Sequence, residues 1–363
     1  MTRRLMEGSE AIARAMVAAG CRFFAGYPMT PFTEVLEHMA RLMPEVGGTC
    51  MNAESELEAI GMVWGAAATG TRAATGSVGQ GLSLMQESLA ELSHARLPVV
   101  VLNMARGQGD YFQATRGGGH GDYRHIVLAP ADVTEAVGLA QLAFHLADRW
   151  RTPVMFMGDY FLAHVQEAVD PAPVHFGEPA AKDWALDGSS SGSGRAKLVS
   201  SISATKVDDP DSVDHGTHLA MIVDHVAAMA AGVEPLVESG FVADAELVVV
   251  AYGTAARYVR YAVGRLRDEG YPVGFVRPIT LWPFPTGAVA EAGGAAGGVA
   301  VFELNNGQMI DDVRLALEGR VPVRPIGGVA FDESGFGISP LLDVGGISGR
   351  ILEALDAPTR ASV

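Results

Sequence analysis

Short apolar runs alternate with longer amphipathic segments along most of this chain. Residues 97–105 (LPVVVLNMA) and 152–159 (TPVMFMGD) are near-continuous apolar runs, and residues 131–150 between them have the spacing of an amphipathic helix. Apolar runs of this kind are typical of strands that are buried on both faces of a parallel sheet. Strands that alternate with helices predict a parallel sheet covered by helices, so we expect an α/β fold.

The alternation is interrupted once, which predicts two domains. Residues 170–212 are rich in Pro, Ser, Gly and Asp, a composition typical of a linker, and apolar runs resume after residue 245. We expect two parallel-sheet domains, at residues 1–165 and 241–363, joined by a linker and a connecting helix at residues 166–240. A chain of 363 residues is long enough for two domains of ordinary size.

The composition argues against several classes of protein. A formal net charge of −16 disfavours nucleic acid or an anionic membrane as the main partner. No apolar run has the composition of a membrane span, and the first residues do not resemble a signal peptide. The chain has only two cysteines, Cys21 and Cys50, so we expect no disulfide framework and a cytoplasmic location. An iron–sulfur cluster normally takes four thiolates, so this chain cannot hold one by itself.

Two acids, Glu54 and Glu56, open a stretch that is otherwise almost uncharged and rich in Gly and Ala. Small side chains on a helix let another backbone, or the ring of a cofactor, approach closely. A helix N-terminus favours negative charge, so both acids could simply be exposed helix-end residues. The local pattern favours that structural interpretation, and the alternative is a buried carboxylate with a chemical task.

Polar stretches follow several of the expected strands, where ligands usually bind to a parallel sheet. Thr30 precedes Pro31, and this pair is typical of the first residues of a helix, so Thr30 could be an N-cap. Arg106 leaves an apolar strand and enters a glycine loop, where it could hold a carboxylate by two parallel hydrogen bonds. Arg116 and Arg124 are competitors for that task, and a surface ion pair is the structural alternative.

Two further stretches carry weaker signals. Residues 76–81 (GSVGQG) could receive an anion through backbone N–H groups or form a tight turn, but they lack the lysine of a P-loop and the GxGxxG spacing. His120 lies between glycines in GGGHGD, either near a ligand or as a loop histidine without a special task. The chain has no HExxH, GxSxG or paired-Cys motif, so we predict neither a hydrolase site nor a metal site.

Several stretches, in order along the chain, resemble the alpha subunits of 2-oxoacid:ferredoxin oxidoreductases, which are thiamine-diphosphate enzymes. The resemblance is greatest to the 2-oxoisovalerate (branched-chain) type, and it includes YPMTP (27–31), GGGHGD (117–122) and RPITLWPFP (277–285). It covers most of the chain outside the linker. It implies a thiamine-diphosphate pyrimidine-binding domain at residues 1–165 and a transketolase C-terminal-like domain at residues 241–363.

The same resemblance implies roles for individual residues. Glu56 aligns with the glutamate that activates the cofactor by sharing a proton with its pyrimidine ring, which leaves Glu54 as the helix-end acid. Thr30 and Arg106 match positions that bind substrate, and the arginine receives the substrate carboxylate. The positions expected to contact the cofactor are Glu56, Tyr27, Pro28, Ser77 and, by a weaker match, His120.

The activity implied is the oxidative decarboxylation of a 2-oxoacid to an acyl-CoA, with electrons passed to ferredoxin. No stretch carries the GDG…N signature that holds magnesium and diphosphate, so a beta subunit is expected to supply those contacts in a hetero-oligomer. Iron–sulfur clusters would lie on a partner subunit or on ferredoxin itself.

Two loops depart from the family pattern. Only three residues separate Arg106 from Asp110, and residues 75–80 lack the proline of relatives. These departures leave the substrate and the use of coenzyme A open. The alternatives are a non-oxidative thiamine-diphosphate decarboxylase or carboligase subunit, and a non-catalytic scaffold subunit.

Overall fold

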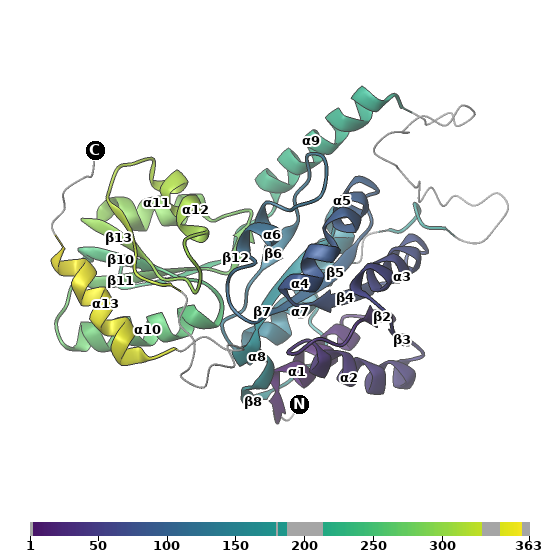
Figure 1. Ribbon diagram of the computed structural model, residues 1–363, viewed down its shortest axis with the longest axis horizontal. Coiled ribbons are helices and arrows are strands. Elements are labelled where there is room, and N and C mark those ends of the chain that lie inside the picture. The colour runs from purple at the N-terminus through teal and green to yellow at the C-terminus, as the bar shows by residue number, and fades with distance from the viewer. Residues whose placement is uncertain (1–2, 179–180, 187–212, 329–341, 358–363) are drawn as a thin grey trace.

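The computed structural model describes residues 3–178, 181–186, 213–328 and 342–357. Two sheets, each mostly parallel and each covered by helices, lie side by side along the long axis of the molecule (Figure 1). The α/β prediction is therefore confirmed. Within the described residues no helix is both long enough and apolar enough to cross a bilayer.

The larger sheet belongs almost entirely to the N-terminal half. Its seven strands run in the order β12 (Thr280–Trp282), β6 (Ile126–Leu128), β7 (Val154–Asp159), β5 (Val99–Ala105), β4 (Ala73–Ser77), β2 (Phe23–Gly26) and β3 (Thr49–Asn52). All neighbours are parallel except β12, which pairs antiparallel with β6. Strands β4, β5 and β6 are wholly buried, and the apolar run at residues 97–105 predicts this for β5.

Helices cover both faces of this sheet. They are α1 (Gly8–Ala18), α2 (Thr33–Leu42), α3 (Glu56–Ala68), α4 (Gly79–Leu84), α5 (Gln86–His94), α6 (Tyr111–Thr115), α7 (Val133–Trp150) and α8 (Tyr160–His164), with a 3-10 turn at Met43–Val46. Successive strand residues point to opposite faces: Val100 packs with α1, α2 and α7, whereas Val101 packs with α3 and α5. This layering positions the loops at the carboxyl ends of β2, β4 and β5.

Two local predictions need correction. Thr30 does not cap a helix, because α2 begins at Thr33 and its N-cap is Phe32. The backbone N–H groups of Phe32 and Thr33 donate to the carbonyl of Met29, so residues 29–32 form a turn of their own before the helix. The pattern of residues 82–95 (LSLMQESLAELSHA) predicts one helix, but the structure has two, α4 from Gly79 and α5 from Gln86, with Met85 at the junction.

The smaller sheet lies in the C-terminal half. Its strands run in the order β14 (Val323–Pro325), β13 (Gly298–Val301), β10 (Leu247–Val250), β11 (Val273–Pro278) and β9 (Val237–Gly240), and only β9 is antiparallel. Its helices are α10 (Gly253–Asp268), α11 (Thr286–Ala295), α12 (Met309–Leu317) and α13 (Val344–Asp356). One hydrophobic cluster runs from α3 and α5 of the first half to α11 and α12 of the second, so the two halves share a core.

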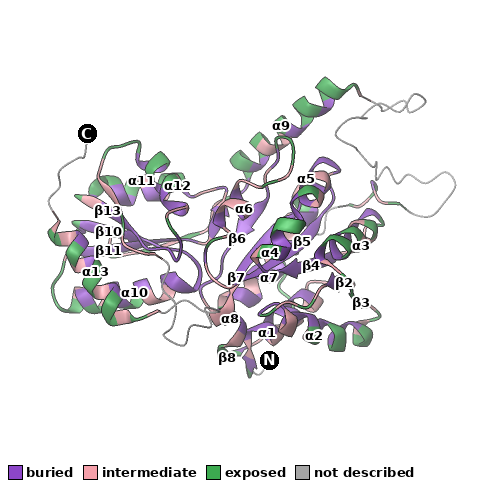
Figure 2. Ribbon diagram, viewed as in Figure 1, coloured by how far each residue is buried: buried purple, intermediate pink, exposed green. Residues whose placement is uncertain are grey.

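The connection between the halves contains three regular elements. β8 (Gln166–Val169) pairs antiparallel with β1 (Arg4–Glu7), α9 (His215–Gly232) extends along one side of the molecule, and β9 joins the smaller sheet. Most of α9 is exposed (Figure 2). Much of the expected linker (187–212) and the C-terminal tail (358–363) lie outside the described residues, and the boundaries at 165 and 241 stay predictions.

Candidate active site

Glu56 is the first residue of α3 and its side chain points into the protein. Only 3% of its surface is exposed, whereas Glu54 and Glu58 are exposed. Ser55 is the N-cap, and its hydroxyl accepts a hydrogen bond of 3.3 Å from the Glu58 N–H. Glu54 thus lies just before the helix in solvent, and the two neighbouring acids have different surroundings.

Ser77 and Gly81 hold the Glu56 carboxyl. The Ser77 hydroxyl, at the end of β4, donates a hydrogen bond of 2.7 Å to Glu56 Oε1. A Cβ atom at Gly81 in α4 would lie 2.3 Å from the same oxygen and 2.1 Å from Ser77 Oγ. Residues 76–81 therefore form a strand-to-helix junction that packs onto Glu56. Ser77, expected to contact the cofactor, contacts Glu56 in this structure.

Thr30 and Arg106 lie next to each other at the same edge of the sheet. They follow β2 and β5, the two strands that flank β4, and Arg106 Nε donates a hydrogen bond of 3.0 Å to the Thr30 carbonyl. Tyr27, half-buried, and Pro28, exposed, come directly after β2 at this edge. Among the described residues, Arg106 forms no ion pair, so its Nη groups are available to an anion.

A cleft of about 370 Å³ opens beside Arg106. It is lined by Arg106, Gly79, Gln80, Ser83, Asp110 and Gln113, together with Gly107 and Gly109. Its lining is mostly polar. Helix α4 separates this cleft from Glu56, with Gly79 facing the cleft and Gly81 facing the carboxyl.

Asp110 is a second carboxyl at this site, and the sequence analysis named it only as the end of the short loop after Arg106. Its Oδ2 accepts a hydrogen bond of 3.1 Å from Asn103 Nδ2, and a Cβ at Gly79 would lie 2.5 Å from its Oδ1. Burial raises the pKa of Asp110 above its usual value. Glycines on opposite sides of a single helical turn therefore leave room for two carboxyls.

The two competitors of Arg106 have other partners. Arg116 Nη2 lies 2.9 Å from Asp312 Oδ1, and its guanidinium stacks over the Phe112 ring. Arg124 Nη1 donates to the carbonyls of Tyr123 and Arg116. Of the three, Arg106 is the one whose two Nη groups both have no partner among the described residues.

His120 lies against α5. Its Nε2 atom is 3.0 Å from Glu91 Oε1, and its ring centroid is 5.2 Å from that of His94. No contact given by the described residues joins His120 to Glu56 or Arg106. Its role as a cofactor contact stays a prediction that this geometry does not support.

The loop after Arg106 is fixed by the C-terminal half, through a residue that sequence reasoning missed. Gln108 is buried; its Nε2 donates to the Tyr252 carbonyl at 3.0 Å and its Oε1 accepts from the Leu304 N–H at 2.8 Å. Asn305 Nδ2 donates to the Gln108 carbonyl at 2.8 Å. The shortness of this loop was visible in the sequence, but its partners, about 150 and 200 positions away, were not.

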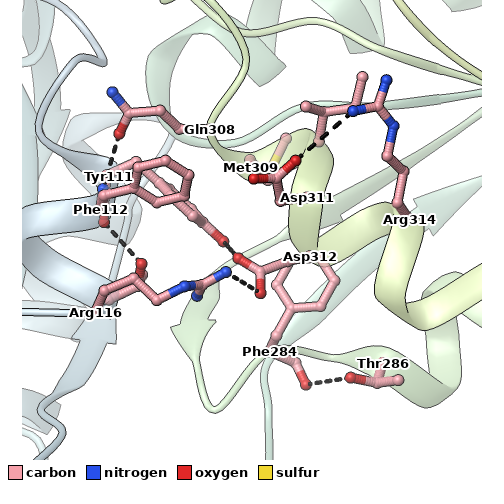
Figure 3. A network of polar contacts seen from close by, with 12 residues as sticks. Tyr111, Phe112, Arg116, Phe284, Thr286, Gln308, Met309, Asp311, Asp312 and Arg314 are labelled. Atoms are coloured by element: carbon pink, nitrogen blue, oxygen red, sulfur yellow. Dashed lines mark hydrogen bonds and ion pairs between the residues drawn. The ribbon is translucent and has the colours of Figure 1, made fainter.

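A second set of polar contacts joins the two halves just beyond this loop (Figure 3). The Tyr111 hydroxyl donates to Asp312 Oδ2 at 2.6 Å, and Asp312 also receives Arg116. Gln308 accepts from the Phe112 N–H and donates to the Gly109 carbonyl, both at 2.8 Å. Burial and then Asp312 raise the pKa of Tyr111 well above its usual value, so the phenol stays protonated and donates.

Comparisons with known proteins identify the family to which the chain belongs. Residues 14–183 match the family described as "Pyruvate flavodoxin/ferredoxin oxidoreductase, thiamine diP-bdg", and residues 245–334 match "Pyruvate:ferredoxin oxidoreductase core domain II". The ketoisovalerate oxidoreductase subunit VorB of Methanothermobacter thermautotrophicus is 38% identical over 87% of this chain and 90% of its own length. The chain belongs to the 2-oxoacid:ferredoxin oxidoreductase family.

Other members of the family are similar to a comparable degree. The 2-oxoglutarate synthase subunit KorA of the same organism is 34% identical over 88% of this chain and 92% of its own length. The resemblance inferred from the YPMTP and GGGHGD motifs is therefore confirmed. Identity at this level to relatives named for two different 2-oxoacids leaves the substrate of this member of the family to be proposed.

Solved structures agree on the fold. A 2-oxoglutarate:ferredoxin oxidoreductase from Magnetococcus marinus superimposes with a TM-score of 0.82 at 24% identity, over 98% of this chain and 66% of that chain. A split-gene transketolase superimposes with a TM-score of 0.60 at 14% identity, over 96% and 98% of the two chains. Together with the family matches at residues 14–183 and 245–334, these superpositions confirm the expected fold of two α/β domains.

Proposed function

We propose that this chain is the alpha subunit of a thiamine-diphosphate-dependent 2-oxoacid:ferredoxin oxidoreductase. The reaction converts a 2-oxoacid and coenzyme A to an acyl-CoA and carbon dioxide, and two electrons pass to ferredoxin. The observation that carries this proposal is the buried Glu56 carboxyl, held by Ser77 at the carboxyl edge of the larger sheet. The family relationship supports the same activity.

The residues of this chain fit one half of thiamine diphosphate. A buried carboxyl that is bonded through one oxygen and faced by glycine suits a pyrimidine ring that must share a proton with it. The sequence has no GDG…N signature for magnesium and diphosphate. A beta subunit that supplies those contacts is therefore part of the proposal, and the complex is a hetero-oligomer.

The cysteines support iron–sulfur clusters on partners rather than on this chain. Burial raises the pKa of the Cys21 thiol to about 12 and that of Cys50 to about 11, so both stay protonated and are poor cluster ligands. Both thiols are free. Free thiols without a disulfide framework also support the cytoplasmic location that we propose.

Each residue of the site has a task that its contacts explain. When bound, thiamine diphosphate supplies the carbon nucleophile that adds to the 2-oxo carbon. Ser77 fixes Glu56 through Oε1, and the described residues offer no hydrogen bond to Oε2, so Oε2 is the oxygen that would be left to share a proton with a bound pyrimidine ring. Thr30 fixes Arg106 through Nε, which turns the two Nη groups toward a substrate carboxylate.

The substrate class follows from relatives more than from the cleft. Two apolar side chains near this edge of the sheet, Phe32 and Met104, are fully buried in the core and do not line the cleft beside Arg106. The greater identity to ketoisovalerate oxidoreductase supports a branched-chain 2-oxoacid. A panel of 2-oxoacids that includes 2-oxoisovalerate and 2-oxoglutarate tests that choice.

The test compares Glu56→Gln with Glu54→Gln in the chain co-expressed with its partner subunits. We expect Glu56→Gln to lower 2-oxoacid-dependent ferredoxin reduction by about 10²- to 10⁴-fold, because an amide cannot exchange the proton. Glu54→Gln, two residues away and exposed, serves as the control and should keep full activity. Full activity of Glu56→Gln would mean that this chain is a scaffold, and an aldehyde or acyloin product without acyl-CoA would identify a non-oxidative decarboxylase or carboligase.

A further inference from the structure

A group of possible metal ligands lies outside the proposed active site, where α5 meets the GGGHGD loop. It consists of Glu91 and His94 on α5 and His120 in the loop, and we call it the histidine cluster. One donor atom from each residue lies within 4.8 Å of the other two, and His120 Nε2 is 3.0 Å from Glu91 Oε1.

The buried ring of His94 lacks hydrogen-bond partners, and that needs an explanation. Its surface is 3% exposed, and neither ring nitrogen has a hydrogen-bond partner among the described residues. Buried polar atoms nearly always have a partner, because leaving one without any costs free energy. The ion pair between His120 and Glu91 satisfies those two residues but leaves His94 unsatisfied.

The backbone is arranged to bring the three side chains together. Glu91 and His94 are three residues apart on α5 and so share one face of the helix. Gly121 has a positive φ of 78°, and a Cβ there would lie 2.9 Å from His94 Nε2. At Gly119 a Cβ would lie 2.4 Å from the Gln86 carbonyl. Only a loop of glycines can lie this close to α5 and present His120 to His94.

We propose that Glu91, His94 and His120 bind a divalent transition-metal ion of the zinc type, which fastens the GGGHGD loop to α5. Two imidazoles and one carboxylate are a ligand set that zinc uses, with water in the fourth position. Bonds of about 2.0–2.2 Å to a tetrahedral ion would bring the donor atoms to roughly 3.4 Å from one another. Rotation of the half-exposed His120 and Glu91 side chains is enough to close that gap.

The chemical type of the donor atoms determines which metal ion the histidine cluster would bind. Magnesium and calcium prefer oxygen ligands throughout, whereas imidazole nitrogen favours zinc and its neighbours in the first transition row. His94 is buried and neither of its ring nitrogens has a hydrogen-bond partner among the described residues, so a ring nitrogen is left to bind the ion. The loop leads back to Arg116 and its ion pair with Asp312, so the ion would also steady the contact between the two halves.

Metal titration of the assembled complex tests the proposal. The complex is stripped with a chelator, saturated with thiamine diphosphate and magnesium, and titrated with Zn²⁺ against a chromophoric competitor and with Co²⁺ for its ligand-field absorption. We expect one tight site per chain in the wild type, a tetrahedral Co²⁺ spectrum, and a zinc-dependent rise in Tm. His120→Ala, an exposed position, should weaken zinc binding by at least about tenfold and abolish the Tm rise.

Two further variants make the result decisive. Glu91→Gln keeps the size of the side chain and should weaken zinc binding in the same direction. His164→Ala is the matched control, because His164 faces Glu34 at 3.5 Å and the described part of the chain places no third ligand beside them, so this variant should bind zinc as the wild type does. Wild-type affinity no greater than that of His120→Ala, or an equal loss in His164→Ala, would overturn the proposal and leave His94 to be satisfied by water in the adjoining cavity of about 40 Å³.

Discussion

The Arg106 guanidinium is fixed by a backbone carbonyl and not by an acid. Its Nε is held by a backbone carbonyl, that of Thr30, which orients the planar group without neutralising its charge. Arg116, by contrast, is already paired with Asp312. A guanidinium that is oriented but not paired with an acid suits the recognition of a carboxylate by two parallel hydrogen bonds.

The substitution Arg106→Lys tests whether Arg106 binds the substrate carboxylate, because it keeps the positive charge but removes the guanidinium. Lysine cannot form the two parallel bonds, so we expect KM for the 2-oxoacid to rise by about 10- to 100-fold, equivalent to about 1.4–2.8 kcal/mol, with a smaller change in kcat. Steady-state ferredoxin reduction measures both constants. Arg124→Lys is the control, because Arg124 contacts only carbonyls. An unchanged KM in Arg106→Lys would exclude Arg106 as the carboxylate contact.

The buried side chain of His125 makes the stability of the folded protein depend on pH. The residue is 1% exposed, and burial followed by Arg124 lowers its pKa to about 3. The unfolded chain binds this proton below about pH 6.5, whereas the folded protein does not until about pH 3, so stability falls as pH falls through this window. Between pH 7.5 and pH 5 the loss from this one group is about 2 kcal/mol.

Urea unfolding of His125→Leu at the two pH values measures that contribution. The variant lacks the titrating ring, so its free energy of unfolding should fall by about 2 kcal/mol less than that of the wild type over the same interval. His175→Leu, at an exposed position, should retain the wild-type difference. Equal pH dependence in wild type and His125→Leu would show that His125 is protonated at similar pH in both states.

At the scale of elements, α4 shows why a short helix can matter more than a long one. Its first turn carries Gly79 against Asp110 and Gly81 against Glu56, and neither position has room for a Cβ. The helix thus separates the polar cleft from the buried carboxyl by a layer no thicker than a backbone. Its position, and therefore that of Glu56, depends on the absence of two side chains.

The variant Gly81→Ala adds one methyl group to this layer. The methyl would lie 2.3 Å from Glu56 Oε1, so the carboxyl or the helix must move; we expect at least a tenfold loss of activity and a loss of stability of about 1–3 kcal/mol. Gly138→Ala in α7, where a Cβ meets nothing within 4 Å, should instead gain about 0.5–1 kcal/mol. Activity assays and urea unfolding on both variants decide the point; full activity in Gly81→Ala would contradict the packing described here.

The elements that sequence predicted are those whose signal is local. The strands β5 and β7 follow from their own apolar runs, and α7 from its own period, whatever lies around them. The three residues of β12 carry no such signal, because they form a strand only by pairing with β6 about 150 positions earlier. The break between α4 and α5 was missed for a similar reason, since Met85 is compatible with a continuous helix.

The site was predictable to a similar extent. The local pattern could not tell Glu56 from Glu54, because what distinguishes them is a hydrogen bond from Ser77 and the closeness of Gly81, more than 20 positions away. Thr30 and Arg106 were named from motifs, and the structure brings them together. The partners of Gln108 and the histidine cluster around His94 depend on contacts between separate parts of the fold, so only the three-dimensional structure reveals them.

At the scale of the whole molecule, Asp312 is the acid that joins the halves near the site. It receives both the Tyr111 hydroxyl and the Arg116 guanidinium, and its side chain is 11% exposed. Its neighbour Asp311 points away and pairs with Arg314 at 3.7 Å on the surface of α12 (Figure 3). The two acids are therefore a matched pair for testing what the contact between the halves contributes.

Asp312→Asn should destabilise the protein by about 2–3 kcal/mol, because it removes a charge-assisted bond and leaves Arg116 partly buried without its counter-ion. Asp311→Asn should change stability by less than about 0.5 kcal/mol. Urea unfolding measures both changes in the free energy of unfolding, from the shift of the midpoint at an unchanged m-value. If the two variants are equally stable, the contacts of Asp312 contribute nothing measurable to holding the halves together.

Strand β12 also bears on how this protein is made. The outer edge of β6 is paired by residues that the ribosome adds about 150 positions later, which at 5–20 residues per second is a delay of roughly 10–30 s. During that delay the nascent chain carries a large sheet with one edge of unpaired backbone groups, which can pair with the wrong strand. The first 240 residues therefore depend on the last 120 to protect them, and a gene cut between the two sheets would yield an N-terminal fragment prone to aggregate.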